Sequence, residues 1–213
     1  SSLMGSLLQV LKFNQARKQS RVRVFELGRV FLRDASVKST DTTVQGFDQP
    51  MRVAGLASGS ADMLQWGRKD QGVDFYDIKG DVEALLAPTK AQFVPGVHPA
   101  MHPGRCAQVL VDQKGIGFVG ELHPRWRTLF DLAQAPVLFE LDLDPVLQRT
   151  VAVFKAVSKF QPVQRDIAMV VDDHVTHDAL MAAIWAESTD GVLREAQLFD
   201  VYRPKASKDA DVA

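Results

Sequence analysis

The sequence predicts an α+β fold in two units, the first over residues 1–150 and the second over residues 151–213. Two patterns predict the first unit: apolar residues at helical spacing, and apolar strands separated by turn signals that suit a mostly antiparallel sheet. A third observation marks the second unit, because the pattern restarts after residue 150 as strand, helix and strand. A chain of 213 residues is long enough for two small domains.

The composition is that of an ordinary globular protein, at 46% hydrophobic and 24% charged residues with a net charge of −1. One cysteine cannot form an internal disulfide, so we expect a reducing, cytoplasmic compartment. No apolar run approaches about 18 residues, so we expect no membrane span. Only residues 1–40 are clearly basic, with eight Lys or Arg against two acids. Charge alone therefore does not predict nucleic-acid binding.

The first predicted elements are a helix and two strands. Residues 3–16 carry apolar side chains three and four positions apart, which predicts a helix. Residues 21–32 and 51–59 are rich in Val and other apolar residues and predict strands. The chain begins inside an apolar run and without an initiator methionine, so we expect it to be cut from a longer protein.

The next predicted element is a helix over residues 75–86, with Asp74 as its N-cap and Pro88 beyond its end. Gly80 lies inside this helix. A glycine there costs about 1 kcal/mol relative to alanine. We therefore expect close packing around Gly80.

Four carboxylates lie on or near the same helix: Asp74, Asp77, Asp81 and Glu83. Oxygen ligands of this kind could hold Mg²⁺. Acidic residues at the start of a helix are also favoured by the helix dipole. We interpret Asp74 and Asp77 as capping residues.

Three more elements complete the first unit. Residues 106–122 predict a hairpin around a turn at residues 112–115. Residues 124–132 predict a short helix, which tolerates Pro124 in its first turn. Residues 136–144 alternate as a strand does.

The second unit reads as a strand over 165–173, a helix over 176–188 with Thr176 as its N-cap, and a strand over 192–202. Residues 203–213 are polar and predict no regular structure. A β-α-β unit without further strands is half of a ferredoxin-like fold. We therefore expect this unit to be truncated.

The residues that most resemble an active site are His98, His102, His123 and the lone Cys106. They could be metal ligands or a thiol nucleophile with its base. Proline follows both His98 and His102 and disfavours helix before it, so their spacing does not place two rings on one helical face. Cys106 precedes an alternating run, where a small buried residue is usual. We prefer a turn at residues 102–105 feeding a strand, and a free-standing metal- or thiol-dependent hydrolase using these four residues stays the alternative.

Several segments together carry a family resemblance. They occur in the order RVFELGRVF, GVDFYDIKGDVEALL, HPGRCAQV, GELHP, QPVQRDIAMVVDD and FDVY. In this order they resemble the C-terminal part of the bacterial phenylalanyl-tRNA synthetase beta subunit. The resemblance covers about residues 3–203 of the chain.

The resemblance implies a class II synthetase-like antiparallel sheet flanked by helices over residues 1–150 and a ferredoxin-fold anticodon-binding domain over 151–213. It implies that the first domain packs against an alpha subunit within an (αβ)₂ heterotetramer. The parent enzyme would charge tRNA(Phe) with phenylalanine in the cytoplasm, using ATP and Mg²⁺. No cofactor is expected in this fragment.

The resemblance also implies an inactive core without catalytic residues. Class II catalysis uses an arginine on a strand that reads Arg-x-Glu, where residues 25–29 here read FELGR. A second arginine would end a later glycine-rich strand, where Leu122 and His123 stand here. Charge stabilisation of the transferred group depends on such cations.

RNA contacts are expected in the second domain, although Phe160 and Pro162 are separated by one residue more than in the family pattern, which otherwise keeps Arg165-Asp166. Cations would pair with phosphates and a tyrosine could stack on an unpaired base. The candidate residues are Lys155, Lys159, Arg165, Tyr202, Arg203 and Lys205.

Overall fold

The computed structural model describes residues 1–148, 154, 159–187 and 189–203. The chain divides into two compact units, residues 1–154 and residues 155–213. Within the described residues, no helix has both the length and the apolar character needed to cross a membrane.

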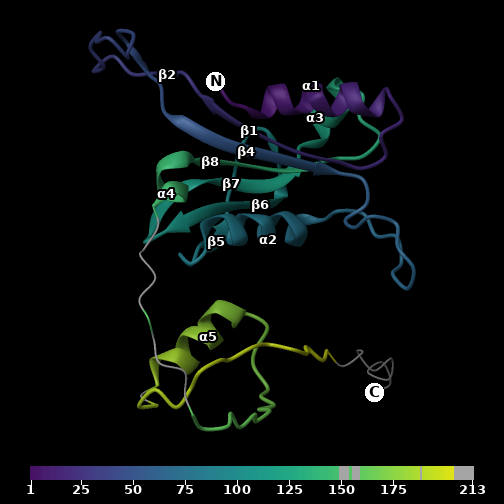
Figure 1. Ribbon diagram of the computed structural model, residues 1–213, viewed down its shortest axis with the longest axis vertical. Coiled ribbons are helices and arrows are strands. Elements are labelled where there is room, and N and C mark those ends of the chain that lie inside the picture. The colour runs from purple at the N-terminus through teal and green to yellow at the C-terminus, as the bar shows by residue number, and fades with distance from the viewer. Residues whose placement is uncertain (149–153, 155–158, 188, 204–213) are drawn as a thin grey trace, which may run out of the picture. The chain divides into compact units, whose positions relative to one another are not determined.

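The first unit is built on a six-stranded, fully antiparallel sheet (Figure 1). This confirms the mixed α+β fold with an antiparallel sheet. A separate two-stranded ribbon extends from the strands of residues 22–29 and 51–58. The sheet runs in the order β1 (Val22–Arg29), β4 (Met51–Ser58), β8 (Val137–Asp142), β7 (Lys114–Leu122), β6 (Met101–Val111) and β5 (Gln92–Pro95), and the ribbon pairs β2 (Leu32–Arg33) with β3 (Phe47–Asp48).

Helices cover both faces of this sheet (Figure 1). On one face, α1 (Met4–Gln15) buries Leu7, Leu8 and Leu11, and α3 (Pro124–Leu129) packs beside it. On the other face lie α2 (Phe75–Leu86) and α4 (Leu143–Leu147). The spacing of the buried leucines in α1 is the helical period that the sequence shows.

The long elements of this unit lie where the sequence predicts them, whereas the β6–β7 turn differs. Its loop has two residues, Asp112 and Gln113, and Lys114 already pairs with Val111 in the ladder. Both loop residues have positive φ, 49° and 64°, as a type I′ turn requires. Four short elements were not predicted, because two to five residues are too few to show a period. They are β2, β3, β5 and α4.

The expectation of close packing at Gly80 is wrong. Gly80 is exposed, and a Cβ built on it would meet no atom within 4 Å. The glycine therefore weakens α2 without any packing in return.

We predict that Gly80→Ala stabilises the first unit by about 0.5–1 kcal/mol, because alanine has the higher helix propensity. Urea unfolding followed by circular dichroism measures the change. A loss of stability would show that Gly80 makes a contact that its exposure conceals.

The second unit contains one helix among its described residues, α5 (His177–Ala186). The Thr176 side chain accepts the backbone N–H of Ala179 at 3.2 Å. This confirms the predicted helix and its N-cap.

The two strands predicted in the second unit are wrong, because the structure assigns neither residues 165–173 nor residues 192–202 to a strand. Their apolar side chains are exposed, Ile167 at 75% and Phe199 at 74%. A strand needs a hydrogen-bonded neighbour as well as an alternating pattern. The sequence shows only the pattern.

Candidate functional site

Three His-Pro pairs form structural turns. Nδ1 of His98 accepts the backbone N–H of Ala100 at 3.3 Å, and Nδ1 of His102 accepts that of Gly104 at 3.0 Å. His123 is the N-cap of α3, and its Nδ1 accepts the N–H of Arg125 at 3.1 Å. In each ring, one nitrogen thus accepts a hydrogen bond from the backbone N–H two residues ahead.

The turn predicted at residues 102–105 is an irregularity inside a strand. β6 already begins at Met101, which pairs with Leu122, and the ladder shifts register before it resumes at Cys106. The backbone N–H of His123 donates to the Ala100 carbonyl at 2.9 Å. This contact joins the two His-Pro segments at the same end of the β6–β7 pair.

Cys106 is a packed side chain, as the sequence indicates. It is 8% exposed, and its Sγ lies 3.5 Å from the sulfur of Met101. Burial raises the pKa of the Cys106 thiol. A nucleophilic cysteine needs an accessible thiolate, which this environment disfavours.

A metal centre at these residues is likewise not supported. Among the residues that the structure describes, no group of three or more His, Cys, Asp or Glu side chains is placed to hold a metal ion. The hydrolase alternative therefore has neither an activated thiol nor a ligand set.

The half-buried His98 carries a pH-dependent contribution to stability. Burial lowers its pKa, the Glu140 carboxylate opposes this shift and the Arg52 guanidinium adds to it. The ring lies 5.1 Å from that of Phe118. Because the folded state binds this proton less readily than the unfolded chain, stability is full above the ordinary histidine pKa of about 6.5 and falls as pH falls below it.

We predict that the wild-type protein loses more stability between pH 7 and pH 5 than His98→Asn does. Asparagine keeps a side-chain acceptor for the N–H of Ala100 and does not titrate. Urea unfolding at several pH values measures both slopes. Equal slopes would remove His98 as the source.

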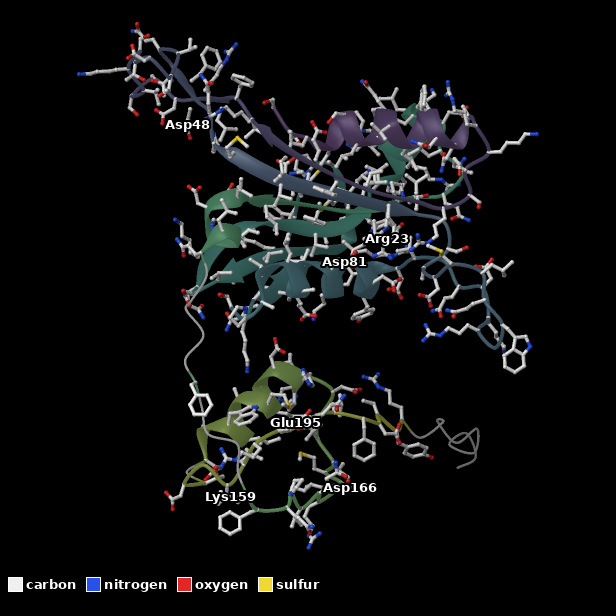
Figure 2. The ribbon with its side chains drawn as sticks, in the orientation of Figure 1. Arg23, Asp48, Asp81, Lys159, Asp166 and Glu195 are labelled. Atoms are coloured by element: carbon white, nitrogen blue, oxygen red, sulfur yellow. The ribbon has the colours of Figure 1, made fainter. Side chains whose placement is uncertain are left out.

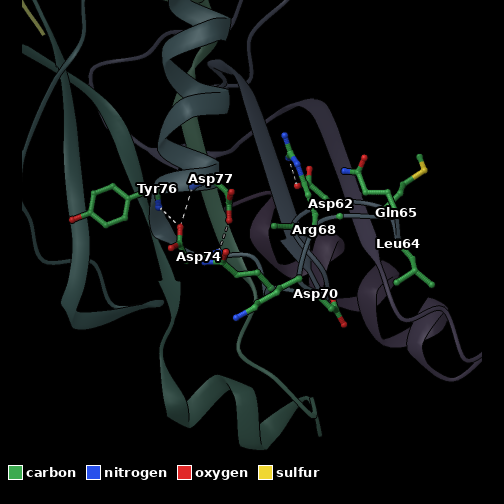
Figure 3. Close-up of a pocket in the computed structure, with 13 residues that line it drawn as sticks. Asp62, Leu64, Gln65, Arg68, Asp70, Asp74, Tyr76 and Asp77 are labelled. Carbon is green, nitrogen blue, oxygen red and sulfur yellow. Dashed lines mark hydrogen bonds and ion pairs between the residues drawn. The ribbon is translucent and has the colours of Figure 1, made fainter. Parts of the chain in front are cut away.

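Asp74 and Asp77 cap α2 as predicted, whereas Asp81 pairs with Arg23 and Glu83 pairs with Lys79. Asp74 Oδ1 accepts the N–H groups of Tyr76 at 2.7 Å and Asp77 at 3.1 Å, and Asp77 Oδ2 accepts the N–H of Asp74 at 2.7 Å. Asp74 and Asp77 form one wall of an open hollow under the loop of residues 61–71 (Figure 3). One oxygen of each carboxylate is engaged with the backbone, and among the described residues no group of three or more possible ligands gathers here, so this hollow gives no support to an Mg²⁺ site.

A buried charge network that the sequence did not reveal links α1 to the centre of the sheet. Glu140 in β8 is 5% exposed. Its Oε1 accepts a hydrogen bond from Nη1 of Arg52 at 2.6 Å. Its Oε2 accepts hydrogen bonds from the Ser2 hydroxyl at 2.6 Å and the Leu3 N–H at 2.8 Å. Arg52 also reaches Asp142 at 3.1 Å. The carboxylate thus lies at the N-terminal end of α1, where the helix dipole favours negative charge.

The residues that stand where class II arginines are expected also have structural roles. Glu26 accepts the hydroxyl of Ser6, and Arg29 donates to the Gln49 carbonyl at 2.9 Å. Leu122 is fully buried and His123 caps α3. These side chains hold the first unit together.

The candidate RNA residues that can be placed are exposed in the second unit: Lys159, Arg165, Tyr202 and Arg203. Arg203 pairs with Asp173 at 3.2 Å, and Arg165 donates to the Gln164 carbonyl at 2.9 Å. Among the residues that the structure describes, no hydrogen bond or ion pair joins two of the four. Figure 2 labels Lys159 among the side chains of this unit. Lys155 and Lys205 lie outside the described residues.

By its geometry the first unit is an α+β module whose histidines, cysteine and buried charges serve its own structure. Two family models match the chain in succession. The phenylalanyl tRNA synthetase beta chain CLM domain matches residues 1–143, and the ferredoxin-fold anticodon binding domain matches residues 158–212.

Curated relatives agree with this match. The chain is 47% identical over 216 residues to the phenylalanine–tRNA ligase beta subunit of Burkholderia lata, covering all of this chain and 27% of the relative. It is 50% identical over 205 residues to that of Chromobacterium violaceum, covering 96% and 25%. The chain belongs to the phenylalanyl-tRNA synthetase beta chain family, and it spans about a quarter of the length of these relatives.

Proposed function

We propose that this chain is a non-catalytic part of a phenylalanine–tRNA ligase beta subunit, and that its whole enzyme charges tRNA(Phe) with phenylalanine at the expense of ATP. One observation carries the proposal: a beta-chain CLM domain and an anticodon-binding domain match one chain in this order. Residues 1–150 would form the scaffold and residues 151–213 would contribute to an anticodon-binding surface.

The first unit, on this proposal, is a class II synthetase-like core without activity. The bonding of Arg29 Nη1 to the Gln49 carbonyl and of His123 to the α3 backbone supports this, because phosphate-binding cations must be free to meet a nucleotide. ATP and Mg²⁺ would bind elsewhere in the holoenzyme, since Asp74 and Asp77 cap α2 and Asp81 and Glu83 form ion pairs. The enzyme would work in the cytoplasm.

The surface that faces an alpha subunit, within an (αβ)₂ assembly, would include the edge strand β1. Val22 and Val24 face α1, so the alternating Phe25 and Leu27 point to the other face. They are 73% and 53% exposed. Large apolar side chains at an open sheet edge are typical of a surface that a partner covers.

The second unit would contact tRNA through Lys159, Arg165, Tyr202 and Arg203, with Lys155 and Lys205 outside the described residues. Exposed cations can pair with phosphates, and Tyr202, at 83% exposure, can stack on a base.

A chimaera tests the proposal. This chain replaces the matching segment of the Burkholderia lata beta subunit, which is then combined with its alpha subunit and assayed for phenylalanylation of tRNA(Phe). We expect activity, and for Arg165→Ala a KM for tRNA raised several-fold with the KM for phenylalanine unchanged. Arg194→Ala, another exposed arginine of the second unit, is the matched control.

Two results would contradict the proposal. A chimaera that folds but does not capture the alpha subunit would remove the scaffold role, and Leu27→Asp should weaken capture if β1 faces the partner. Phenylalanine-dependent exchange of pyrophosphate into ATP by the 213-residue chain alone would contradict its assignment as non-catalytic.

A further inference from the structure

Basic residues gather on one face of the first unit. Residues 4–18 and 124–130 together hold five Lys or Arg and no Asp or Glu, whereas Arg23 of β1 pairs with Asp81 of α2 on the opposite face. These segments contribute α1 and α3, which lie on the same face of the sheet (Figure 1). Trp126 and Phe130 of the second segment pack against the core that α1 forms. The exposed cations of this basic face are Lys12, Arg17, Lys18, Arg125 and Arg127, and Arg127 donates to the carbonyls of Leu132 and Ala133.

The opposite face carries the opposite charge. Residues 70–83, which lead into α2 and form most of it, hold five Asp or Glu and one Lys. The net charge of −1 for the chain therefore conceals a separation of charge across the sheet. A polyanion would be attracted to the α1–α3 face and repelled from the α2 face.

Lys12 and Lys18 of the basic face are free to meet a ligand, whereas the Arg17 guanidinium donates to the Phe13 carbonyl at 3.0 Å. Within the described part of the chain, the side chains of Lys12 and Lys18 make no hydrogen bond or ion pair. The Arg17 guanidinium lies 3.3 Å above the ring of Phe13, which is 56% exposed. Arg125 lies 4.6 Å above the ring of Trp126. Of the nearby carboxylates, Glu26 and Glu140 are bonded to other residues, and the exposed Asp131 lies just beyond α3.

We propose that the basic face binds the phosphate backbone of RNA, as a contact separate from the anticodon-binding unit. This inference rests on the proposed function for the identity of the RNA, which would be tRNA(Phe). Lysines and arginines gain affinity by releasing counterions from phosphates. The two arginine–aromatic pairs add flat surfaces on which an unpaired base can stack. An acidic protein partner would pair with the cations alone and would make no use of the two arginine–aromatic surfaces.

Binding of a tRNA(Phe) transcript to the 213-residue chain, measured across a salt series, tests the basic face. We expect Lys12→Glu/Lys18→Glu to lower affinity at least about tenfold and to reduce the slope of log K against log salt by about two. The control Lys38→Glu/Lys114→Glu makes the same change of charge at the β2–β3 ribbon and the β6–β7 turn. It should bind nearly as the wild type does.

The outcomes separate this inference from the proposed function. The basic face would be overturned if the wild type and both double variants bound tRNA with the same affinity and the same salt slope. Weaker binding by Arg165→Ala in the same series would keep the second unit as the RNA contact. Unchanged tRNA binding with loss of alpha-subunit capture would assign the face to a protein partner instead. Absence of any tRNA binding by the wild-type chain would overturn both RNA contacts. Lys12→Ala/Lys18→Ala, with a native circular dichroism spectrum, separates lost contacts from a folding defect.

Discussion

Glu140→Ala is expected to lower the free energy of unfolding of the first unit by about 3 kcal/mol, the lower end of the range for removing one partner of a buried ion pair, because Arg52 is 26% exposed and keeps Asp142. The change leaves the guanidinium of Arg52 without its buried partner and the Leu3 N–H and Ser2 hydroxyl without an acceptor. It also removes the negative charge at the start of α1. Urea unfolding followed by circular dichroism measures the loss.

Asp142→Ala is the matched control, because Asp142 accepts from the same arginine but its side chain is 43% exposed. We expect a loss below about 1 kcal/mol there, as for other exposed ion pairs. Glu140→Gln should fall between the two, because an amide oxygen can still accept from the helix start. Equal losses for Glu140→Ala and Asp142→Ala would show that burial of the carboxylate adds nothing.

Gly117→Ala is expected to destabilise the first unit by about 3 kcal/mol, the upper range for overpacking a filled site. Gly117 in β7 pairs with Leu141 in β8. A Cβ there would lie 2.1 Å from the carbonyl oxygen of Glu140 and 2.8 Å from the Cα of Leu141. Both atoms belong to the backbone, so the central strands would have to separate. Thermal and urea unfolding measure the effect.

Gly72→Ala is the control for this substitution, since a Cβ at Gly72 meets no atom within 4 Å. It should change stability by less than about 0.5 kcal/mol. With Gly80→Ala, the same chemical change then gives three results, a gain, no effect and a large loss. A stable Gly117→Ala protein with a native spectrum would show that β7 and β8 can move apart at little cost.

Much of the fold could be predicted because its signals are local. The leucine spacing of α1, the Asp74 capping box and the Thr176 cap each involve residues within a few positions of one another. The predicted strands of the second unit were wrong for the converse reason. Alternation over residues 165–173 favours an extended chain, but a ladder depends on a neighbouring strand that no local pattern specifies.

The candidate site followed the same division. Proline after His98 and His102 indicated turns, and the structure shows both rings accepting backbone N–H groups. The Arg52–Glu140 pair was not predicted, although each partner is a single charge inside an apolar strand, MRVAGL or VLFEL. Nothing in the sequence pairs those charges, because 88 positions separate them.

By itself, the sequence determined α1, α2, α3 and α5, the caps Asp74 and Thr176, most of the strands of the first unit and the resemblance to phenylalanyl-tRNA synthetase beta chains, since each rests on neighbouring residues or on an ordered set of motifs. Only the tertiary structure decided that Gly117 is closely packed where Gly80 is open, that Glu140 anchors α1, and that the basic face and the acidic α2 segment lie on opposite faces of the sheet. These properties arise where folding brings distant segments into contact, and a contact of that kind has no period, spacing or motif along the chain.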